Sequence, residues 1–282
     1  MISTGGHLTI LESVDSTNNY AMAKVRTGLA KHGDGFFAMA QVNGKGQRGK
    51  TWVTEPGTNI ILTLVMQPSP LTLGLQFSFS AAIALAAHDF FARYAGDETT
   101  IKWPNDIYWR DRKAGGILIE SIIGSNDGLV ATGEEAHHTE FLVAGSGPTG
   151  DEQGTEYYKP KAGNWLWAIV GMGININQTS FPAGIQNAVS LKQITGKDWD
   201  VIALAKELRN DVLNRFTQLL AGGDVITAYN ERLFKKGQTA RFKKGSRVFD
   251  GTVKLVNENG ELVLITSMEE HFAFGEIEWV LG

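Results

Sequence analysis

The stretch LQFSFSAAIALAAHDFFARYAG, residues 75–96, constrains the possible folds more than any other part of the chain. It is rich in alanine, largely apolar and closed by a glycine, so it predicts one long, well-buried helix. The chain has 282 residues, and 43% of them are hydrophobic. This is enough material for one sizeable core around such a helix and for a smaller second core.

The first 235 residues contain both segments that predict strands and segments that predict helices. The predicted strands cover residues 8–10, 36–42, 59–67, 100–109, 114–123 and 166–177. The other predicted helices run from a cap at Asp15, Ser16 or Thr17 through Val25, over 201–222 and over 226–234. This order predicts a domain that contains both strands and helices.

The pattern changes at Gly237. From there on, short alternating runs are separated by turn signals such as NENG, residues 257–260. These runs predict a small all-β barrel. We therefore expect two domains, residues 1–235 and residues 236–282.

Composition excludes several classes of protein. The chain has no cysteine, which rules out disulfides, thiolate catalysis and cysteine-based zinc sites. A net charge of −4 and a pI of 5.9 argue against a general nucleic-acid binder, so we expect no DNA partner. The sequence shows neither a signal peptide nor an uninterrupted apolar stretch of about 18 residues. We therefore expect a cytoplasmic protein without a membrane partner.

Residues 124–164 differ from the rest of the chain. They contain eight glycines, and seven Asp or Glu against two Lys, between two strands that otherwise look like direct neighbours. Compact domains rarely contain so long a connection, so we expect a flexible acidic insertion. Its GEEAHH stretch, residues 133–138, has adjacent histidines, which seldom converge on one metal ion. We expect no metal site there.

Residues 41–52, QVNGKGQRGKTW, form the first candidate site, which we call the cationic loop. Its glycines alternate with Lys45, Arg48 and Lys50, and it ends on Trp52. Backbone N–H groups of such a loop can point into one concavity, and the cations suit phosphate or carboxylate oxygens. The spacing of a Walker loop is missing. A mobile hairpin is the alternative interpretation, because glycine first of all supplies turns.

KWPNDIYW, residues 102–109, is the second candidate site. Pro104 restricts the backbone, so Lys102, Asn105 and Asp106 would project from a stiff break in the chain. A turn capped by the Asn and Asp side chains is the alternative.

RKAGGILIE, residues 112–120, is the third candidate site. Lys113 precedes Gly115 and Gly116 at the start of a strand, where missing side chains allow a ligand to approach the backbone. A β-bulge with a surface lysine is the alternative.

The remaining polar motifs are weaker. Ser16, Thr17 and Asn18 could be a plain helix cap. Asn175 and Asn177 alternate with apolar neighbours in GMGININ, residues 171–177, and could simply face solvent. The histidines show no ligand spacing, and no Gly-x-Ser-x-Gly motif is present, so triad hydrolysis has no support.

The joint occurrence of these motifs is more specific than any one of them. STNN, QVNGKGQRGKTW, KWPNDIYW, KAGGILIE and GMGININ follow one another in this order, and together the chain resembles the biotin protein ligases. This is the biotin–(acetyl-CoA carboxylase) ligase family, and the resemblance spans about Leu8 to Val280 apart from the insertion. It implies an α+β fold: a class II synthetase-like biotin/lipoate ligase core, in which a mixed β-sheet is backed by helices, followed by a small SH3-like β-barrel.

The same resemblance implies an ATP-dependent enzyme. Members join the carboxylate of biotin to ATP, giving biotinyl-5′-AMP, and then pass biotin to one lysine of the biotin carboxyl carrier protein of acetyl-CoA carboxylase. Lys113, Asp106 and Arg48 would be the catalytic residues. Lys113 would bridge the biotin carboxylate and the α-phosphate, and Asp106 would orient the incoming lysine.

The resemblance also implies the ligand contacts. Biotin would be bound by Ser16, Thr17, Asn18, Gln41, Gly44, Lys45, Gly46, Gln47, Lys113, Gly115 and Gly116. ATP would be bound by Arg48, Lys50, Trp52, Lys102, Asn105, Lys113 and Asn175. Mg²⁺ should accompany the ATP, without a metal site built from protein side chains.

One departure from the family pattern concerns the cationic loop. Many relatives read GRGRRGR where this chain reads GKGQRGK. Lysine lacks the planar, two-pronged geometry of arginine, and Gln47 also lacks the charge. We therefore expect weaker retention of the reactive adenylate.

Three further expectations concern function and partners. A lipoate or octanoate ligase, which shares the fold, and a non-catalytic biotin sensor are the alternative functions. Only 15 residues precede Ser16, so we expect a ligase without the N-terminal DNA-binding domain of the bifunctional relatives. The GMGININ stretch could be an edge strand that pairs with a second ligase, giving a homodimer, or with the carrier.

Overall fold

The computed structural model describes residues 6–124, 164–182, 185 and 187–281. The predicted insertion therefore lies outside the described residues, apart from its first and last positions. The GEEAHH stretch lies outside them as well.

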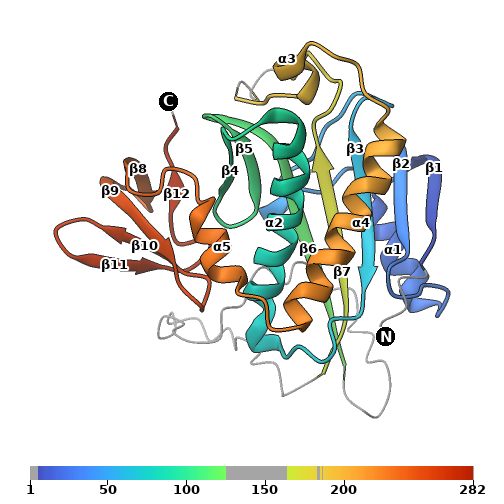
Figure 1. Cartoon of the computed structure of the whole chain (residues 1–282), viewed down its shortest axis with the longest axis horizontal. Helices are drawn as coiled ribbons and strands as arrows, with labels where there is room; N and C mark the ends of the chain where they lie inside the picture. Colours follow the sequence, from blue (N-terminus) through green and yellow to red (C-terminus); the bar gives the residue numbers. More distant parts are fainter. Residues whose placement is uncertain (1–5, 125–163, 183–184, 186, 282) are drawn as a thin grey trace.

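A seven-stranded mixed sheet forms the body of the protein (Figure 1). Its strands are β1 (Leu8–Val14), β2 (Gly35–Gln41), β3 (Ile60–Met66), β4 (Thr99–Lys102), β5 (Asp106–Trp109), β6 (Arg112–Gly124) and β7 (Asn164–Ile174). They lie in the order β1-β2-β3-β7-β6-β5-β4. β1 and β2 are parallel, and all other neighbours are antiparallel.

β7 lies in the middle of this sheet, between β3 and β6. The expectation that GMGININ is an edge strand is therefore wrong, because both of its edges are hydrogen-bonded within the protein. The edge strands of the sheet are β1 and β4. Isoleucine and valine predict a buried strand in β7 but do not indicate which neighbours it has.

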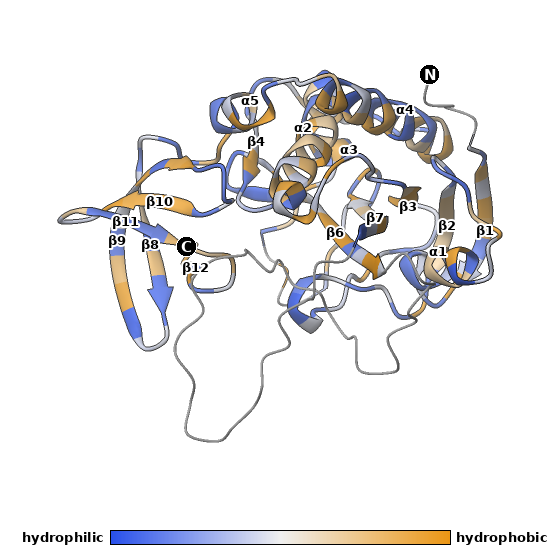
Figure 2. Ribbon diagram, turned by 90° about the horizontal axis from the view of Figure 1, so that it is seen from below, coloured by the Kyte–Doolittle hydropathy of each residue, from blue (hydrophilic) through white to orange (hydrophobic). Residues whose placement is uncertain are grey.

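Helices cover both faces of the sheet, unequally. α2 (Gln76–Ala95) and α4 (Val201–Leu220) pack against each other on one face, whereas α1 (Thr17–Arg26) covers part of the other (Figure 2). Residues 73–95 form, among those described, the one helical stretch long and apolar enough to cross a membrane, and 72% of its most apolar window is buried inside the protein. The predicted core helix is thus confirmed. Three shorter segments complete the body: α3 (Leu191–Thr195), α5 (Val225–Glu231) and the 3₁₀ turn η2 (Leu73–Leu75).

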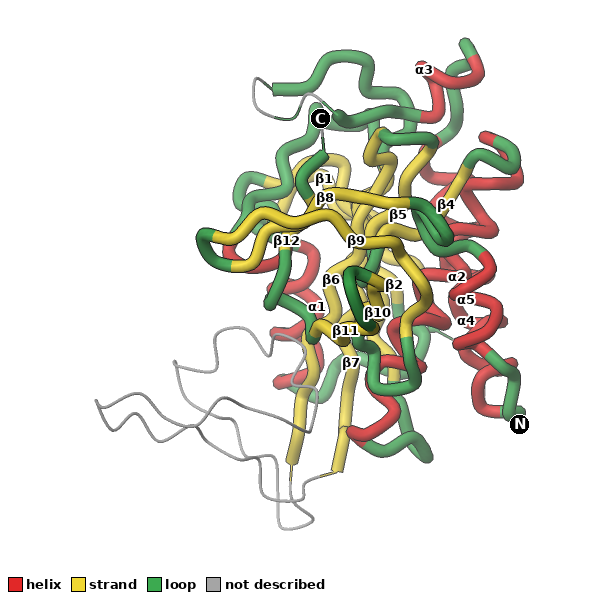
Figure 3. Tube along the Cα trace, turned by 90° about the vertical axis from the view of Figure 1, so that its left-hand side faces the viewer, coloured by secondary structure: helices red, strands yellow, loops and turns green. Residues whose placement is uncertain are grey.

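A second, antiparallel sheet of five strands lies beside the first (Figure 3). Its strands are β8 (Thr239–Lys244), β9 (Arg247–Val256), β10 (Leu262–Ile265), β11 (Glu269–Phe272) and β12 (Glu278–Trp279). Their order is β11-β10-β9-β8-β12, and no ladder joins β11 to β12 among the described residues. This arrangement agrees with the expected SH3-like fold, but as an open sheet rather than a closed barrel. A division of the chain at residues 235 and 236 stays a proposal.

Two hydrogen bonds, one to the β9–β10 connection and one from α5, fix the turn that carries the KWPND motif. The indole N–H of Trp103 donates to the carbonyl of Gly260, at 2.9 Å. The hydroxyl of Tyr229, on α5, donates to the carbonyl of Pro104, at 2.8 Å. Both bonds are buried, and buried polar groups are costly to leave without a partner. The turn is therefore held rigidly from two directions.

Candidate active site

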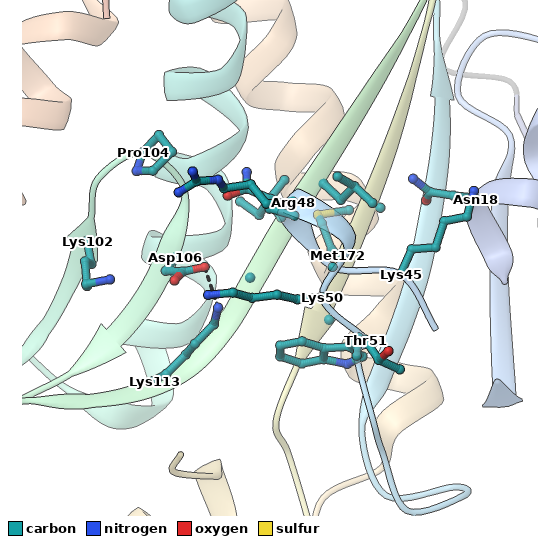
Figure 4. Close-up of a pocket in the computed structure, with 18 of the residues that line it drawn as sticks. Asn18, Lys45, Arg48, Lys50, Thr51, Lys102, Pro104, Asp106, Lys113 and Met172 are labelled. Atoms are coloured by element: carbon teal, nitrogen blue, oxygen red, sulfur yellow. Dashed lines mark ion pairs between the residues drawn. The ribbon is translucent and has the colours of Figure 1, made fainter. Parts of the chain in front are cut away.

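A cavity of about 430 Å³ opens between the first sheet, the cationic loop and the second sheet. Most of the predicted site residues line it: Ser16, Thr17, Asn18, Gln41, Lys45, Gly46, Gln47, Arg48, Lys50, Trp52, Lys102, Asp106, Lys113 and Gly116. Figure 4 shows part of this lining. Motifs far apart in the sequence thus converge on one site.

The cationic loop folds as a hairpin over the cavity. Lys45 and Thr51 form an antiparallel bridge, and the N–H of Trp52 donates to the carbonyl of Gly44 at 2.9 Å. Its tip is a short 3₁₀ turn, η1 (Gln47–Gly49), in which Arg48 has a φ of 55°. The loop is therefore a hairpin that lines the cavity, whereas its mobility and its role in binding an anion stay predictions.

Two glycines of β7 form the floor of the cavity. A methyl group on Gly173 would lie 2.4 Å from Trp52 Cε2, and one on Gly171 would lie 2.3 Å from Asn18 Oδ1. Both side chains therefore rest directly on the strand backbone. The sequence analysis missed these two positions, although glycines two residues apart in a strand indicate close approach on one face.

Hydrogen bonds fix the polar end of the cavity. The backbone N–H and the hydroxyl of Thr17 both donate to Gln41 Oε1, at 2.7 and 3.0 Å. The buried hydroxyl of Thr63, on β3, lies 2.6 Å from Asn18 Oδ1 and donates to it. Ser16 is the N-cap residue of α1, but its side chain makes no capping hydrogen bond. A plain helix cap therefore does not account for these residues.

Lys113 and Asp106 form an ion pair at the other end, with 2.7 Å between Nζ and Oδ1, drawn as the dashed line in Figure 4. The pairing of β5 with β6 shifts register at this point, because Tyr108 lies opposite Lys113 and Ile107 opposite Gly115. Ala114 is thus the extra residue of a β-bulge. Since side chains alternate along a strand, the bulge brings Lys113 to the face of Asp106. The bulge interpretation was correct, but the lysine points into the cavity.

The cavity is strongly cationic although the chain is acidic overall. Its charged lining residues are Lys45, Arg48, Lys50, Lys102 and Lys113 against Asp106 and Glu278. Lys50, Lys102 and Lys113 surround Asp106 in Figure 4. Such an excess of positive charge is unfavourable in the absence of an anion.

The unfavourable excess of positive charge is clearest at Lys102. Its ammonium lies over the rings of Tyr108 and Trp279, 5.2 and 5.7 Å from their centroids. The pKa of Lys102 is lowered from 10.5 to about 8, mainly by burial; Asp106 opposes this shift, and Lys113 and Lys50 add to it.

Four predicted residues do not line the cavity. Gly44 and Gly115 leave room for the backbone, because a methyl group would lie 2.3 Å from Trp52 O and 2.5 Å from Ile174 Cδ1, respectively. The buried amide of Asn105 donates to the carbonyl of Ile117 at 2.7 Å. The buried amide of Asn175 donates to the carbonyl of Val189 at 3.2 Å, so this side chain does not face solvent. Asn177 is also bonded, to the backbone of Trp199.

The second sheet contributes a wall that the sequence analysis missed. Phe274, Ile277, Glu278 and Trp279 all line the cavity. Glu278 lies 3.8 Å from Arg48 of the cationic loop. The indole N–H groups of Trp279 and Trp52 are buried without a hydrogen-bond partner among the described residues.

The site therefore has a polar end that presents amides and hydroxyls, a flat indole surface and a cationic end. A ligand that suits it has hydrogen-bonding groups at one end and several negative charges at the other.

Solved structures of similar fold define the class. Biotin protein ligase from Aquifex aeolicus, in complex with biotin and ATP, has a TM-score of 0.71 and 19% identity, over 98% of this chain and 99% of that chain. Biotin protein ligase from Leishmania major, in complex with biotinyl-5-AMP, has a TM-score of 0.56 and 20% identity, over 98% and 99%. The fold is thus that of the biotin protein ligases.

Sequence comparisons agree. Residues 10–133 match the model of the biotin/lipoate A/B protein ligase family. The bifunctional ligase/repressor BirA of Escherichia coli is 34% identical over 119 residues, 41% of this chain and 35% of that protein. The biotin–(acetyl-CoA carboxylase) ligase of Paracoccus denitrificans is 40% identical over 124 residues, 43% of this chain and 50% of that protein. These alignments span half of the relatives' length or less. The sequence similarity to the biotin/lipoate A/B protein ligase family thus lies in residues 10–133, whereas the similarity of fold extends over nearly the whole chain.

Proposed function

We propose that this protein is an ATP-dependent biotin protein ligase. The observation that carries the proposal is the Lys113–Asp106 pair at the cationic end of a cavity whose other end presents Asn18 and Gln41. Relatives solved with biotin and ATP, and with biotinyl-5-AMP, share the fold and support the choice of substrates.

The first step joins two anions. An oxygen of the biotin carboxylate attacks the α-phosphorus of ATP, the bond to the pyrophosphate oxygen breaks, and pyrophosphate leaves with the electron pair. Lys113 would neutralise charge between the carboxylate and the α-phosphate, while Lys50 and Arg48 would meet the phosphates. Fixed cations in a partly dry site stabilise such a transition state without reorganisation.

Trp52 and the polar end would hold the two substrates in place. The Trp52 indole, fixed on Gly173, offers a flat surface for the adenine ring. The ureido group of biotin has one acceptor and two donors, which suit the amides and hydroxyls of Ser16, Thr17, Asn18 and Gln41. Holding the biotin carboxylate and the α-phosphate in a reactive alignment is itself a large part of the catalysis.

Magnesium would enter with the triphosphate. The described residues contain no group of three or more His, Cys, Asp or Glu that could hold a metal ion. Phosphate oxygens would therefore supply most of its ligands, and one cavity carboxylate, Asp106 or Glu278, could add another. When bound, the ion supplies positive charge to the departing pyrophosphate.

The second step transfers biotin to the carrier. The lysine ammonium of the biotin carboxyl carrier protein first gives one proton to water; the neutral amine then attacks the anhydride carbon, the bond to the AMP oxygen breaks with its electron pair leaving on AMP, and the second proton passes from the nitrogen to water. Asp106 would hold the incoming ammonium in exchange for Lys113. A free lysine has a pKa of about 10.4, so it needs such help at neutral pH.

Incubation with labelled biotin, Mg-ATP and a carrier domain tests this function. We expect label on one carrier lysine and loss of that label in Lys113→Ala. A parallel reaction with labelled lipoic acid should give no product. Binding of biotin without adenylate or transfer would point instead to a sensor, and labelling by lipoic acid alone would point to a lipoate ligase.

A further inference from the structure

The carboxylate of Glu120, on β6, contacts two different parts of the site with its two oxygens. Oε2 accepts a hydrogen bond from Asn18 Nδ2 at 2.7 Å. Oε1 lies 4.0 Å from Nζ of Lys45, in the cationic loop. Figure 4 shows Lys45 extending toward Asn18. One side chain thus joins the start of α1 to the loop that covers the cavity.

The first contact sets the orientation of the Asn18 amide. Asn18 Oδ1 receives the hydrogen of Thr63 at 2.6 Å, and its Nδ2 donates to Glu120. The reversed amide would place its oxygen against the Glu120 carboxylate and would lose that hydrogen bond, whereas Thr63 could bond to either amide atom because its hydroxyl also lies 2.8 Å from Thr17 Oγ1. Glu120 therefore decides which atoms of Asn18 are presented to a ligand.

The second contact restrains the cationic loop. The side chains of Lys45 and Glu120 are only 32% and 20% exposed. The loop's other ion pair, Arg48 with Glu278, has exposures of 40% and 64% and is more strongly screened by water and salt. Glu120 is therefore the more protected of the two anchors.

Glu120 lies away from the reacting atoms. Its side chain shares a face of β6 with Gly116 and Leu118, because every second residue points the same way. Gly116 is opposite Asp106, and Glu120 is four residues further along, about 13 Å at the usual rise of a strand. At this distance Glu120 cannot exchange a proton with the reacting atoms. Its role is therefore to position other side chains.

We propose that Glu120 is a positioning residue of the biotin subsite, which fixes the Asn18 amide for the ureido group and, through Lys45, links occupation of that end to closure of the cationic loop. This inference rests on the proposed function. It extends that function to a residue outside the predicted contact set.

Two substitutions separate the two contacts. Glu120→Gln keeps an acceptor for Asn18 but removes the charge that attracts Lys45. We expect its dissociation constant for biotin to change less than about threefold, its release of biotinyl-AMP to accelerate about three- to fivefold, and amide exchange in residues 43–52 to accelerate. Glu120→Ala also leaves the Asn18 donor without a partner, so its dissociation constant for biotin should rise about ten- to a hundredfold.

Three controls make the test specific. Glu269→Gln removes a carboxylate from the Lys254–Glu269 pair on the second sheet and should change none of these values. Lys45→Met should match Glu120→Gln in adenylate release, and the double variant should be no worse than either. Thermal unfolding of each variant checks folding, and the turnover rate of Glu269→Gln at saturating biotin should stay within about twofold of wild type.

The outcomes are distinguishable. A wild type that makes no biotinyl-AMP would overturn the proposed function, and amide exchange in Glu120→Gln would still test the link to the loop. A wild type that makes biotinyl-AMP, together with a Glu120→Ala variant of unchanged biotin affinity, would overturn the positioning role alone. Additive effects of Glu120→Gln and Lys45→Met would overturn the link through Lys45.

Discussion

The indole ring of Trp52 lies on the backbone of Gly173, so close that a single methyl group on residue 173 would come within 2.4 Å of Trp52 Cε2. Two residues earlier on β7, Gly171 has the same relation to Asn18. The indole surface and the polar end of the cavity, to which we assign the nucleotide and biotin, thus rest on neighbouring positions of one strand. Each can be disturbed without touching the other.

Gly173→Ala should displace Trp52 and weaken binding of ATP about tenfold, because the ring loses its fixed position. The dissociation constant for biotin should change less than about threefold, as is usual for a substitution remote from the binding site. Gly171→Ala is the matched control and should show the reverse pattern, since its methyl group would meet Asn18. Calorimetric titration of both variants with both ligands checks this. Equal losses for both ligands in both variants would mean general damage to the sheet instead.

Lys113→Met should reduce the rate of adenylation at least about a hundredfold, because it removes a cation from the point where two negative groups meet. The apolar stem of the side chain is largely kept, so biotin should still bind. Release of pyrophosphate measures the rate. Lys113→Arg keeps the charge and should retain more activity than Lys113→Met; the opposite ranking would argue against charge neutralisation.

Lys102 should make ATP binding depend on pH. In the free protein its amine loses its proton above a pKa of about 8, and a bound phosphate favours the protonated form. Affinity for ATP should therefore be constant below pH 8 and fall by up to about tenfold per pH unit above it. Titrations from pH 7 to 9.5 check this, and Lys102→Met should remove the pH dependence. A pH-independent affinity in the wild type would contradict the role of this lysine.

The same residue should lower the stability of the free protein. Between the folded-state pKa of about 8 and the unfolded value near 10.5, the unfolded chain binds more protons than the folded one, so stability should rise with pH. Below pH 8 the free energy of unfolding is lowered by the full cost of burying the charged Lys102 ammonium. Lys102→Met should therefore raise the thermal midpoint at pH 7 while weakening ATP binding. A lower midpoint would mean that its packing contributes more than its charge costs.

Gln47→Arg should slow the release of biotinyl-AMP, because a guanidinium adds a charged, two-pronged contact to the loop that covers the adenylate. Gln47 lines the cavity, so the new group can reach the ligand. The release rate can be measured by forming labelled biotinyl-AMP on the protein and following its loss, either on a desalting column or after a chase with unlabelled biotin. Equal rates for variant and wild type would end this explanation.

Local patterns in the sequence predicted much of the fold. The apolar composition of residues 75–96 and the spacing in 201–222 gave α2 and α4, because a helix depends on neighbours three or four residues apart. The motifs also indicated most of the residues that line the cavity. Such signals act over short distances and can be read from one sequence.

Features that depend on pairing between distant segments could not be predicted in this way. Thr63, Gly171 and Glu120 meet Asn18 only because β3, β7 and β6 lie side by side in that order. The central position of β7 was missed for the same reason. The direction of Lys113 depends on one extra residue in a strand pair, which no periodicity reveals.

The wall formed by Phe274, Ile277, Glu278 and Trp279 has a practical consequence. Ligases that attach a small tag to a chosen lysine are attractive as labelling reagents, and a shorter reagent is easier to fuse to other proteins. Under the proposed function, removing β12 from this chain would open the cavity to water and expose biotinyl-AMP to hydrolysis. A compact derivative would need to keep its last strand.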